Sequence, residues 1–264
     1  MTERRRTFLK TVGGTAVALT LAGCGQSEDG TDDDGTDGNT SDDGTGDDMS
    51  DDDGSEEPEP AEAGLSVAHL SPDAPNVDVY VDGDAVLEDV PYRTFSDYLD
   101  LTEGEYDIEI TAAGDAETVV FDETVELGAG DFTAAALGEL AEENQPFSVE
   151  VFESDLELPA DSARVRAIHA SPDAPNVDIT VEETGDVLFA DVPFGAAGSV
   201  EVPEGTYTLE IRPATENNDG DVVATFDVEL AAETVYTAAA VGYLEPDSAP
   251  ADEAFDLALT VDAE

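Results

Sequence analysis

From residue 65 onward, apolar and acidic side chains alternate along many short segments of the chain. The period of two is clearest in residues 77–82, 106–110, 177–181, 207–211 and 224–230. Successive side chains of a β-strand point to opposite faces of the sheet, so each segment has one apolar and one acidic face. This pattern is typical of half-buried strands in antiparallel sheets.

Turn signals separate these segments, for example at residues 82–84, 103–104 and 218–220. Their spacing predicts about seven strands in roughly 100 residues, which is the layout of an immunoglobulin-like β-sandwich. Residues 147–152 and 255–261 are expected to be final strands.

Two alanine-rich runs, at residues 132–137 and 236–241, are harder to assign. Alanine favours helices by intrinsic propensity. However, Gly138 and Gly242 follow the runs directly, so each run has about six residues, which is short for a core helix. We therefore predict strands at both places.

The second half of the chain repeats the first. Residues 69–78 return as residues 169–178, with only Leu70 and Ala170 differing. Shorter matches continue downstream, with growing offsets that place insertions in turns. The matched segments are 89–91 with 191–193, 103–106 with 204–207, and 132–136 with 236–240. The repeat predicts an all-β fold of two tandem immunoglobulin-like antiparallel β-sandwich modules, at residues 65–160 and 161–264.

The charge balance limits the partners of this chain. It carries 8 basic and 66 acidic residues, a formal net charge of −58. Binding of nucleic acid requires clustered Lys and Arg, so nucleic acid is excluded as a natural partner. At molar salt the Debye length is roughly 3 Å and self-repulsion is largely screened. The acidity therefore indicates adaptation to high salt. A single cysteine excludes a disulfide framework.

Residues 1–23 have the features of an export signal. A short apolar stretch at residues 11–21 is too short for a bilayer span, which needs about 20 residues. The candidate signal residues before it are Arg5, Arg6, Phe8, Leu9 and Lys10. The segment resembles a twin-arginine signal with a lipobox ending at Cys24, as in lipoproteins of halophilic-archaeal type. This resemblance implies cleavage before Cys24 and lipidation of its sulfur. The alternative is an ordinary cleaved signal with a stray cysteine.

Residues 24–64 are expected to form a tether. After Cys24 the segment is rich in Asp, Glu, Gly, Ser and Thr and has no basic residue. Such a composition cannot bury enough apolar surface to offset the entropy of ordering, so we predict disorder. Asn39 begins an Asn-Thr-Ser sequon and is a candidate for N-glycosylation.

Four features of the repeat together resemble the domain-of-unknown-function family 4397. They are the Ser-Pro-Asp-Ala-Pro motif behind a strand that ends in His, the Val-Pro-Tyr/Phe step, the Glu-Gly-x-Tyr hairpin and the aromatic-Thr-Ala-Ala-Ala strand. The resemblance covers nearly all of residues 65–262. It implies an extracytoplasmic all-β module, often found in tandem in secreted and surface-anchored proteins, with no established activity. In the first repeat Ala68-His69 follows Ser66-Val67, where the second has Arg164-Val165-Arg166, so a role of these arginines cannot be shared.

The repeated motif has a structural and two chemical interpretations. Its candidate residues are His69, Ser71, Pro72, Asp73, Pro75, His169, Ser171, Pro172, Asp173 and Pro175. In the structural interpretation, which we favour, the prolines preset a turn, Ser and Asp bind neighbouring backbone amides, and His ties the turn to another strand. A hydrolytic site would use Ser as nucleophile and His as base. A metal site would use His169, Asp173 and Asp178, but no second His or Cys is at hand.

The sequence therefore predicts a cell-surface lipoprotein that is not an enzyme and needs no cofactor. Its predicted partners are the membrane, through the lipid anchor, and envelope proteins, surface glycans or cations. The loops at residues 91–97 and 193–199 are candidate contact surfaces. The alternatives are a ligand-capture lipoprotein that serves a transporter, an extracytoplasmic hydrolase and a passive envelope spacer.

Overall fold

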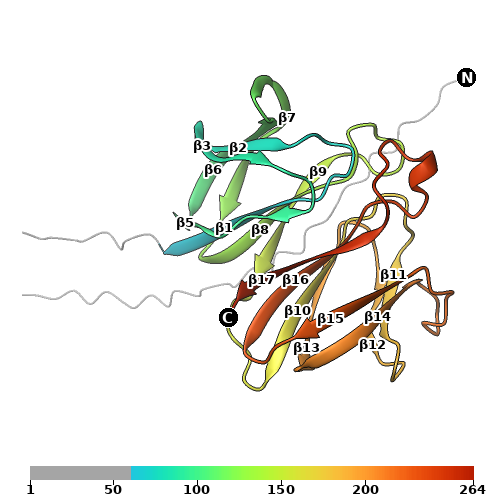
Figure 1. Ribbon diagram of the computed structural model, residues 1–264. Helices are drawn as coiled ribbons and strands as arrows, with labels where there is room; N and C mark the ends of the chain where they lie inside the picture. Colours follow the sequence, from blue (N-terminus) through green and yellow to red (C-terminus); the bar gives the residue numbers. More distant parts are fainter. Residues whose placement is uncertain (1–60) are drawn as a thin grey trace, which may run out of the picture. The chain divides into compact units, whose positions relative to one another are not determined.

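The computed structural model describes residues 61–264, which fold almost entirely into β-strands (Figure 1). Module 1 contains β1 (Glu62–His69), β2 (Val77–Val81), β3 (Asp84–Val90), β4 (Thr94–Phe95), β5 (Leu99–Thr102), β6 (Gly104–Ala112), β7 (Asp115–Leu127), β8 (Gly130–Leu137) and β9 (Ser148–Ser154). Module 2 contains β10 (Ser162–His169), β11 (Val177–Val181), β12 (Val187–Val192), β13 (Ala197–Pro203), β14 (Gly205–Pro213), β15 (Ala224–Leu230), β16 (Thr234–Val241), the short 3-10 helix η1 (Pro246–Ser248) and β17 (Asp256–Ala263). The prediction of two tandem all-β modules is confirmed. The predicted boundary at residue 65 is wrong, because β1 already begins at Glu62 and Ala63 is buried in the core of module 1.

Each module is built from two sheets with a hydrophobic core between them. In module 1 the order β3-β2-β6-β7 makes one sheet, and β1, β8 and β9 with β4 and β5 make the other. In module 2 the corresponding sheets are β12-β11-β14-β15 and β13-β10-β16-β17. Alternate residues of the central strands, such as Val77, Val79 and Val81, form the core of module 1. The period-two pattern therefore identified the inward-facing positions correctly.

One strand pair in each module is parallel, whereas all the other pairs are antiparallel. β1 pairs in parallel with β8, and β10 pairs in parallel with β16. Hairpins force neighbouring strands to be antiparallel, but parallel strands need a long connection. Here that connection contains the whole second sheet of the module, together with β4 and β5 in module 1 and β13 in module 2. The alternation of apolar and acidic residues within one segment does not show whether its neighbouring strand runs parallel or antiparallel to it.

The alanine-rich runs are strands, as predicted, and they lie at the centre of their sheets as β8 and β16. Every residue of β16 is buried, and so are the last five residues of β8. A strand that is covered on both faces reads as a continuous apolar run instead of an alternating one. The covering on the second face is provided by the other module, as described below.

The loops expected at residues 91–97 and 193–199 are instead partly strands. β4 pairs with the end of β1, and β13 pairs with β10 from Ser162 to Ile168. Tyr92, Phe95 and Phe194 from these segments pack against a buried cluster whose members come from both modules. The turn signals located the chain reversals but not the extra edge strands beside them.

No helix within residues 61–264 is long and apolar enough to cross a membrane.

Candidate functional site

The Ser and Asp of the repeat motif bind a distant loop of their own module. The Ser71 hydroxyl donates a hydrogen bond to the carbonyl oxygen of Gly138, at 2.7 Å. The two carboxylate oxygens of Asp73 accept hydrogen bonds from the backbone amides of Leu140 and Ala141, each at 2.8 Å. The motif therefore fixes the loop between β8 and β9.

Module 2 repeats these contacts. Ser171 donates to the carbonyl oxygen of Gly242 at 2.7 Å. Asp173 accepts hydrogen bonds from the amides of Leu244 and Glu245 at 2.8 and 2.9 Å. The prediction that these side chains bind neighbouring amides is wrong. The Ser and Asp side chains lie 67 to 72 residues from these partners in the sequence because β1 and β10 end beside the ends of β8 and β16.

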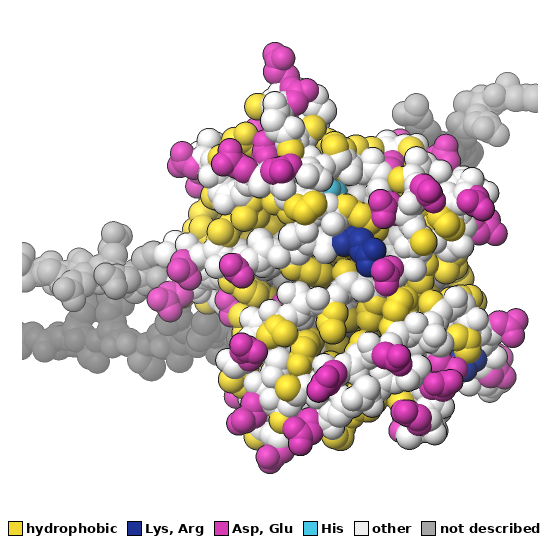
Figure 2. Space-filling view, in the orientation of Figure 1, with side chains coloured by type: hydrophobic (Ala, Val, Ile, Leu, Met, Phe, Trp, Pro, Cys, Tyr) yellow, Lys and Arg dark blue, Asp and Glu magenta, His cyan; other side chains and the backbone are white. Residues whose placement is uncertain are grey.

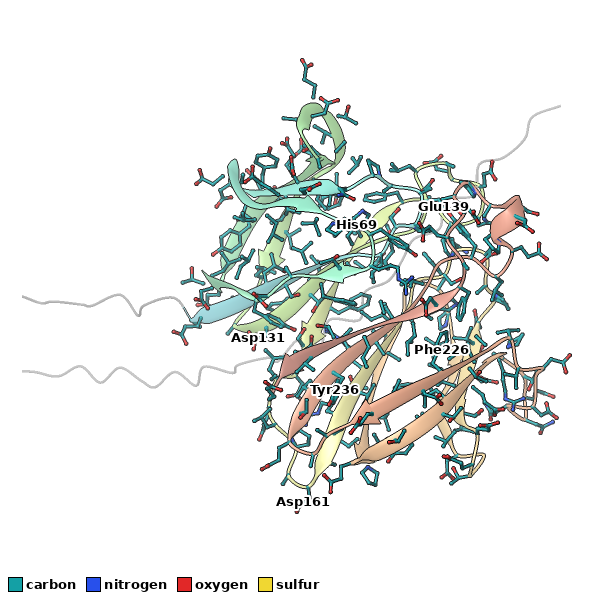
Figure 3. All side chains as sticks on the ribbon, viewed as in Figure 1. His69, Asp131, Glu139, Asp161, Phe226 and Tyr236 are labelled. Atoms are coloured by element: carbon teal, nitrogen blue, oxygen red, sulfur yellow. The ribbon has the colours of Figure 1, made fainter. Side chains whose placement is uncertain are left out.

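The two histidines are buried inside their modules and bind within their own turn (Figure 3 shows His69). His69 Nε2 lies 2.9 Å from the carbonyl oxygen of Pro75, and His169 Nε2 lies 3.0 Å from that of Pro175. An Nε2–H tautomer donates these bonds. We predicted that each histidine connects the turn to another strand. The structure shows instead that it connects the two ends of the motif. The ring of His69 also packs edge-on against Tyr92, with 6.0 Å between ring centroids.

Burial lowers the pKa of both histidines from their ordinary value of 6.5, and the hydrogen bond to a proline carbonyl opposes this only in part. Below pH 6.5 the unfolded chain then binds protons more readily than the folded chain. The free energy of unfolding should fall as the pH drops from 7 to 5. A His69→Gln/His169→Gln chain keeps side-chain N–H donors but cannot titrate, so its stability should change less over this interval. Urea titrations at fixed molar salt measure the free energy of unfolding at each pH. If it fell equally with pH in both proteins, the two histidines would not cause the pH dependence.

Asn76 and Asp78 lie at the end of the repeated segment and bind residues in and beside the β3-β2-β6-β7 sheet, which we call the outer sheet, as we do its counterpart β12-β11-β14-β15. In module 1 the Asp78 carboxylate accepts hydrogen bonds from the amides of Asp89 and Gly114, which lower its pKa. The Asn76 amide donates to the Asp89 side chain at 2.8 Å. Asp178 and Asn176 make the matching contacts in module 2.

A buried apolar cluster joins the two modules, and we call this contact the joint. It is formed by one face of the β1/β8 sheet and one face of the β10/β16 sheet. Its buried members are Ala68, Leu70, Ala135, Leu137, Ile168, Ala170, Ala239, Val241 and Ala258. Most of these side chains are small, which allows the two sheets to approach closely. The joint explains why β8 and β16 are apolar on both faces.

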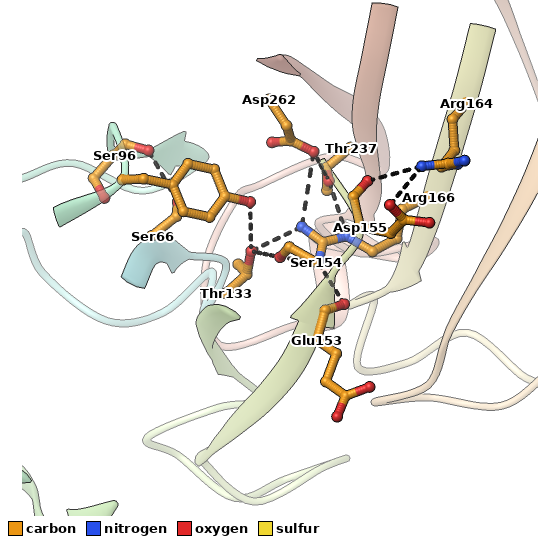
Figure 4. A network of polar contacts seen from close by, with 11 residues as sticks. Ser66, Ser96, Thr133, Glu153, Ser154, Asp155, Arg164, Arg166, Thr237 and Asp262 are labelled. Atoms are coloured by element: carbon orange, nitrogen blue, oxygen red, sulfur yellow. Dashed lines mark hydrogen bonds and ion pairs between the residues drawn. The ribbon is translucent and has the colours of Figure 1, made fainter. Parts of the chain in front are cut away.

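Arg166 crosses the joint and is only 6% exposed. Its Nε donates to the hydroxyl of Thr237 in its own module at 2.9 Å. Its two terminal nitrogens donate to Thr133 and Ser154 of module 1, each at 2.8 Å (Figure 4). A carboxylate oxygen of Asp262 lies 3.9 Å away. Burial raises the pKa of Asp262, while hydrogen bonding to Thr237 and the charge of Arg166 oppose the rise.

Arg93 makes a second polar contact across the joint. Its guanidinium pairs with Asp256 of module 2. The backbone of Arg93 has φ of 68°, in the left-handed region where non-glycine residues are strained. Gly195 stands at the corresponding place in module 2 with φ of 73°. Module 1 thus has an arginine where the backbone favours glycine, and its side chain forms an ion pair across the joint.

Two further features complete the joint. Tyr243 of module 2 stands at the position that Glu139 occupies in module 1, and both are fully buried. Burial and then the charge of Glu139 raise the pKa of Tyr243. Arg164 holds the connection between the modules through an ion pair with Asp155 and a hydrogen bond to the carbonyl oxygen of Glu157, each at 2.7 Å.

The four arginines of residues 61–264 are therefore unevenly placed. Arg93 and Arg166 cross the joint and Arg164 binds the connection, whereas Arg212 pairs with Glu210 within module 2. Acidic side chains are spread over the visible face of the molecule (Figure 2). Most of the scarce positive charge thus lies where the two acidic modules meet.

The chemical interpretations of the motif gain no support from this geometry. The Ser71 and Ser171 hydroxyls are fully buried and donate to carbonyl oxygens, not to His. Asp173 and Asp178 are engaged with separate backbone amides. Within the part of the chain that the structure describes, no three His, Cys, Asp or Glu side chains are grouped for metal binding. Cys24, Asn39 and the signal residues at 5–10 lie outside the described residues.

The joint between the modules was not predicted from the sequence. The continuous apolar runs of β8 and β16 were its signal, since half-buried strands would alternate. The difference between Ser66 and Arg166 was visible too, but the sequence does not reveal which sheet faces are in contact.

The profile of a family described as "Domain of unknown function (DUF4397)" matches residues 63–180 and residues 165–263. No curated protein matches. A solved structure described as "The Bacillus anthracis TIE protein" is 13% identical and covers 69% of this chain, with a TM-score of 0.22. The match spans only 34% of that protein. With so low a TM-score, it supports no inference about fold or function. Because the two profile matches together extend over residues 63–263, the chain belongs to the DUF4397 family.

Proposed function

We propose that this protein is a non-enzymatic surface lipoprotein that holds a single two-module body outside the cell for binding or adhesion. The main observation behind the proposal is that the side chains of the repeat motif are engaged in contacts within the fold. Its buried Ser and His side chains are bonded within the fold in both modules. This supports a role in which the motif builds the module and the outer surface makes the contacts.

The anchoring part of the proposal rests on the sequence of residues 1–64. The twin-arginine pattern and the lipobox support export and lipidation at Cys24. The acidic segment after Cys24 would then act as the tether. The acidic surface supports function in concentrated salt, where its self-repulsion is screened.

Anchoring is tested with the full chain and a Cys24→Ser variant expressed in a haloarchaeal host. The parent should remain with the membrane fraction and react with a label that does not cross membranes. The Cys24→Ser chain should appear in the medium. Retention of both proteins inside the cell would refute surface anchoring.

Binding is tested with the released Cys24→Ser chain as bait on native cell envelopes at molar salt. The matched control is the same chain after unfolding in low salt and urea. Enrichment of one glycan or envelope protein by the folded bait alone supports binding or adhesion. Equal recovery by both baits would instead favour a passive spacer.

A further inference from the structure

The joint brings together corresponding positions of the two repeats. Thr133 and Thr237 correspond in the repeat, and both accept a hydrogen bond from Arg166. The apolar cluster contains four corresponding pairs, which are Ala68 and Ile168, Leu70 and Ala170, Ala135 and Ala239, and Leu137 and Val241. A surface that meets its own counterpart in this way has the organisation of an isologous dimer interface.

Two side chains break this symmetry and specify which faces can pair. Ser66 is the counterpart of Arg166, and its hydroxyl donates to the carbonyl oxygen of Ser96 in its own module. Pairing of two module 2 faces would bring two Arg166 guanidinium groups to one pair of threonines, where like charges repel. Pairing of two module 1 faces would have no guanidinium at all.

The ion pair between Arg93 and Asp256 adds to this preference. The strand registers place Ser148 at the position of Asp256 and the repeat places Gly195 at the position of Arg93. The ion pair therefore forms only when a module 1 face meets a module 2 face. Both asymmetric contacts select the same pairing.

Nothing in these contacts requires the two modules to belong to one chain. The connection between them, residues 155–161, has no strand. It is held through the exposed carboxylate of Asp155 and the carbonyl of Glu157, both bound by Arg164. When released and extended at about 3.4 Å per residue, the eight steps from Ser154 to Ser162 span roughly 27 Å.

We propose that the joint also forms between two copies of this chain, with module 1 of one copy on module 2 of the other. The partner that this surface fits is therefore a second copy. Reciprocal exchange closes into a dimer with two joints, which is domain swapping. At low concentration the short connection favours closure within one chain, because its effective concentration is in the millimolar range. This inference does not depend on surface anchoring.

The test uses two full chains, each with one damaged joint face. Leu137→Asp puts a carboxylate into the module 1 face, and Val241→Asp does the same in the module 2 face. Both parent side chains are fully buried in the joint cluster. Each variant alone should be monomeric at molar salt by light scattering. An equimolar mixture should form a heterodimer, because the Val241→Asp copy supplies an intact module 1 face and the Leu137→Asp copy an intact module 2 face.

The matched controls are Val119→Asp and Val187→Asp, which change side chains that are 44% and 45% exposed and lie outside the joint cluster. Their mixture should remain monomeric. If the Leu137→Asp and Val241→Asp mixture also remained monomeric while both proteins kept their strand circular dichroism, the proposal would be overturned. Homodimers of either variant would overturn the pairing rule.

A second measurement covers the case in which a variant fails to fold. Two parent chains with different tags are mixed at about 1 mM, which is comparable to the effective concentration within one chain. They are unfolded together in urea and returned to molar salt. Each tag should then retain the other on an affinity column, whereas mixing without unfolding should give little retention. No co-retention after refolding would refute exchange.

Discussion

Gly138→Ala is expected to lower the free energy of unfolding of this protein by about 3 kcal/mol or more. Gly138 has φ of 78°, and a Cβ atom built there would lie only 2.2 Å from the carbonyl oxygen of Pro146. The backbone at this place must shift, which disturbs the Ser71 hydrogen bond to the Gly138 carbonyl. Urea unfolding at constant molar salt measures the loss.

Gly114→Ala is the matched control in the same module. Gly114 has φ of 76°, but a Cβ atom built at this position would have no other atom within 4 Å. The change should therefore cost only the backbone strain of a left-handed alanine, about 1 kcal/mol. Equal losses for the two variants would show that steric contact with the β8–β9 loop does not matter.

Arg166→Ala is expected to cost about 3 kcal/mol, the lower end of the range for breaking a buried ion pair. The change removes the bonds to Thr133, Ser154 and Thr237 and leaves the buried carboxylate of Asp262 without its cation. Hydrogen exchange should increase first in β8 and β16, because the joint covers these strands. Removing Asp262 as well, in Arg166→Ala/Asp262→Ala, should restore part of the loss.

Arg212→Ala provides the comparison, since it removes an arginine from module 2 without touching the joint. Arg212 pairs with Glu210 in the outer sheet, and its side chain is 21% exposed. Arg212 also donates to the carbonyl oxygen of Gly220 at 2.6 Å, and the loss of these partly exposed contacts should cost about 1 to 2 kcal/mol. If Arg166→Ala were no more destabilising than Arg212→Ala, the network at the joint would have no special energetic role.

Much of the fold could be predicted from the sequence because its signals are local. Alternating valines such as Val77 and Val79 identify an inward-facing side, and a turn signal identifies a reversal. The repeat then transfers each assignment from one module to the other. The family resemblance rests on motifs that recur in both modules, and the two profile matches confirmed it.

The contacts of the motif could not be predicted because they depend on long-range register. Ser71 and Asp73 suit a local turn by their chemistry, and only the parallel pairing of β1 with β8 brings the β8–β9 loop to them. The contacts of Arg166 with module 1 could not be predicted for the same reason. Its partners Thr133 and Ser154 are identified only once the facing sheets are known.

The parallel pairing of β1 with β8 also has a consequence for how each module folds. The first strand cannot find its central partner until nearly the whole module has left the ribosome, because the pair joins residues such as Ala63 and Gly130. Folding rates fall as contacts join residues more distant in sequence, and sandwiches of this kind fold in milliseconds to seconds. Until β8 arrives, the edge of β1 that will pair with β8 exposes unpaired backbone N–H and C=O groups, so the nascent chain is most prone to aggregate before each module closes.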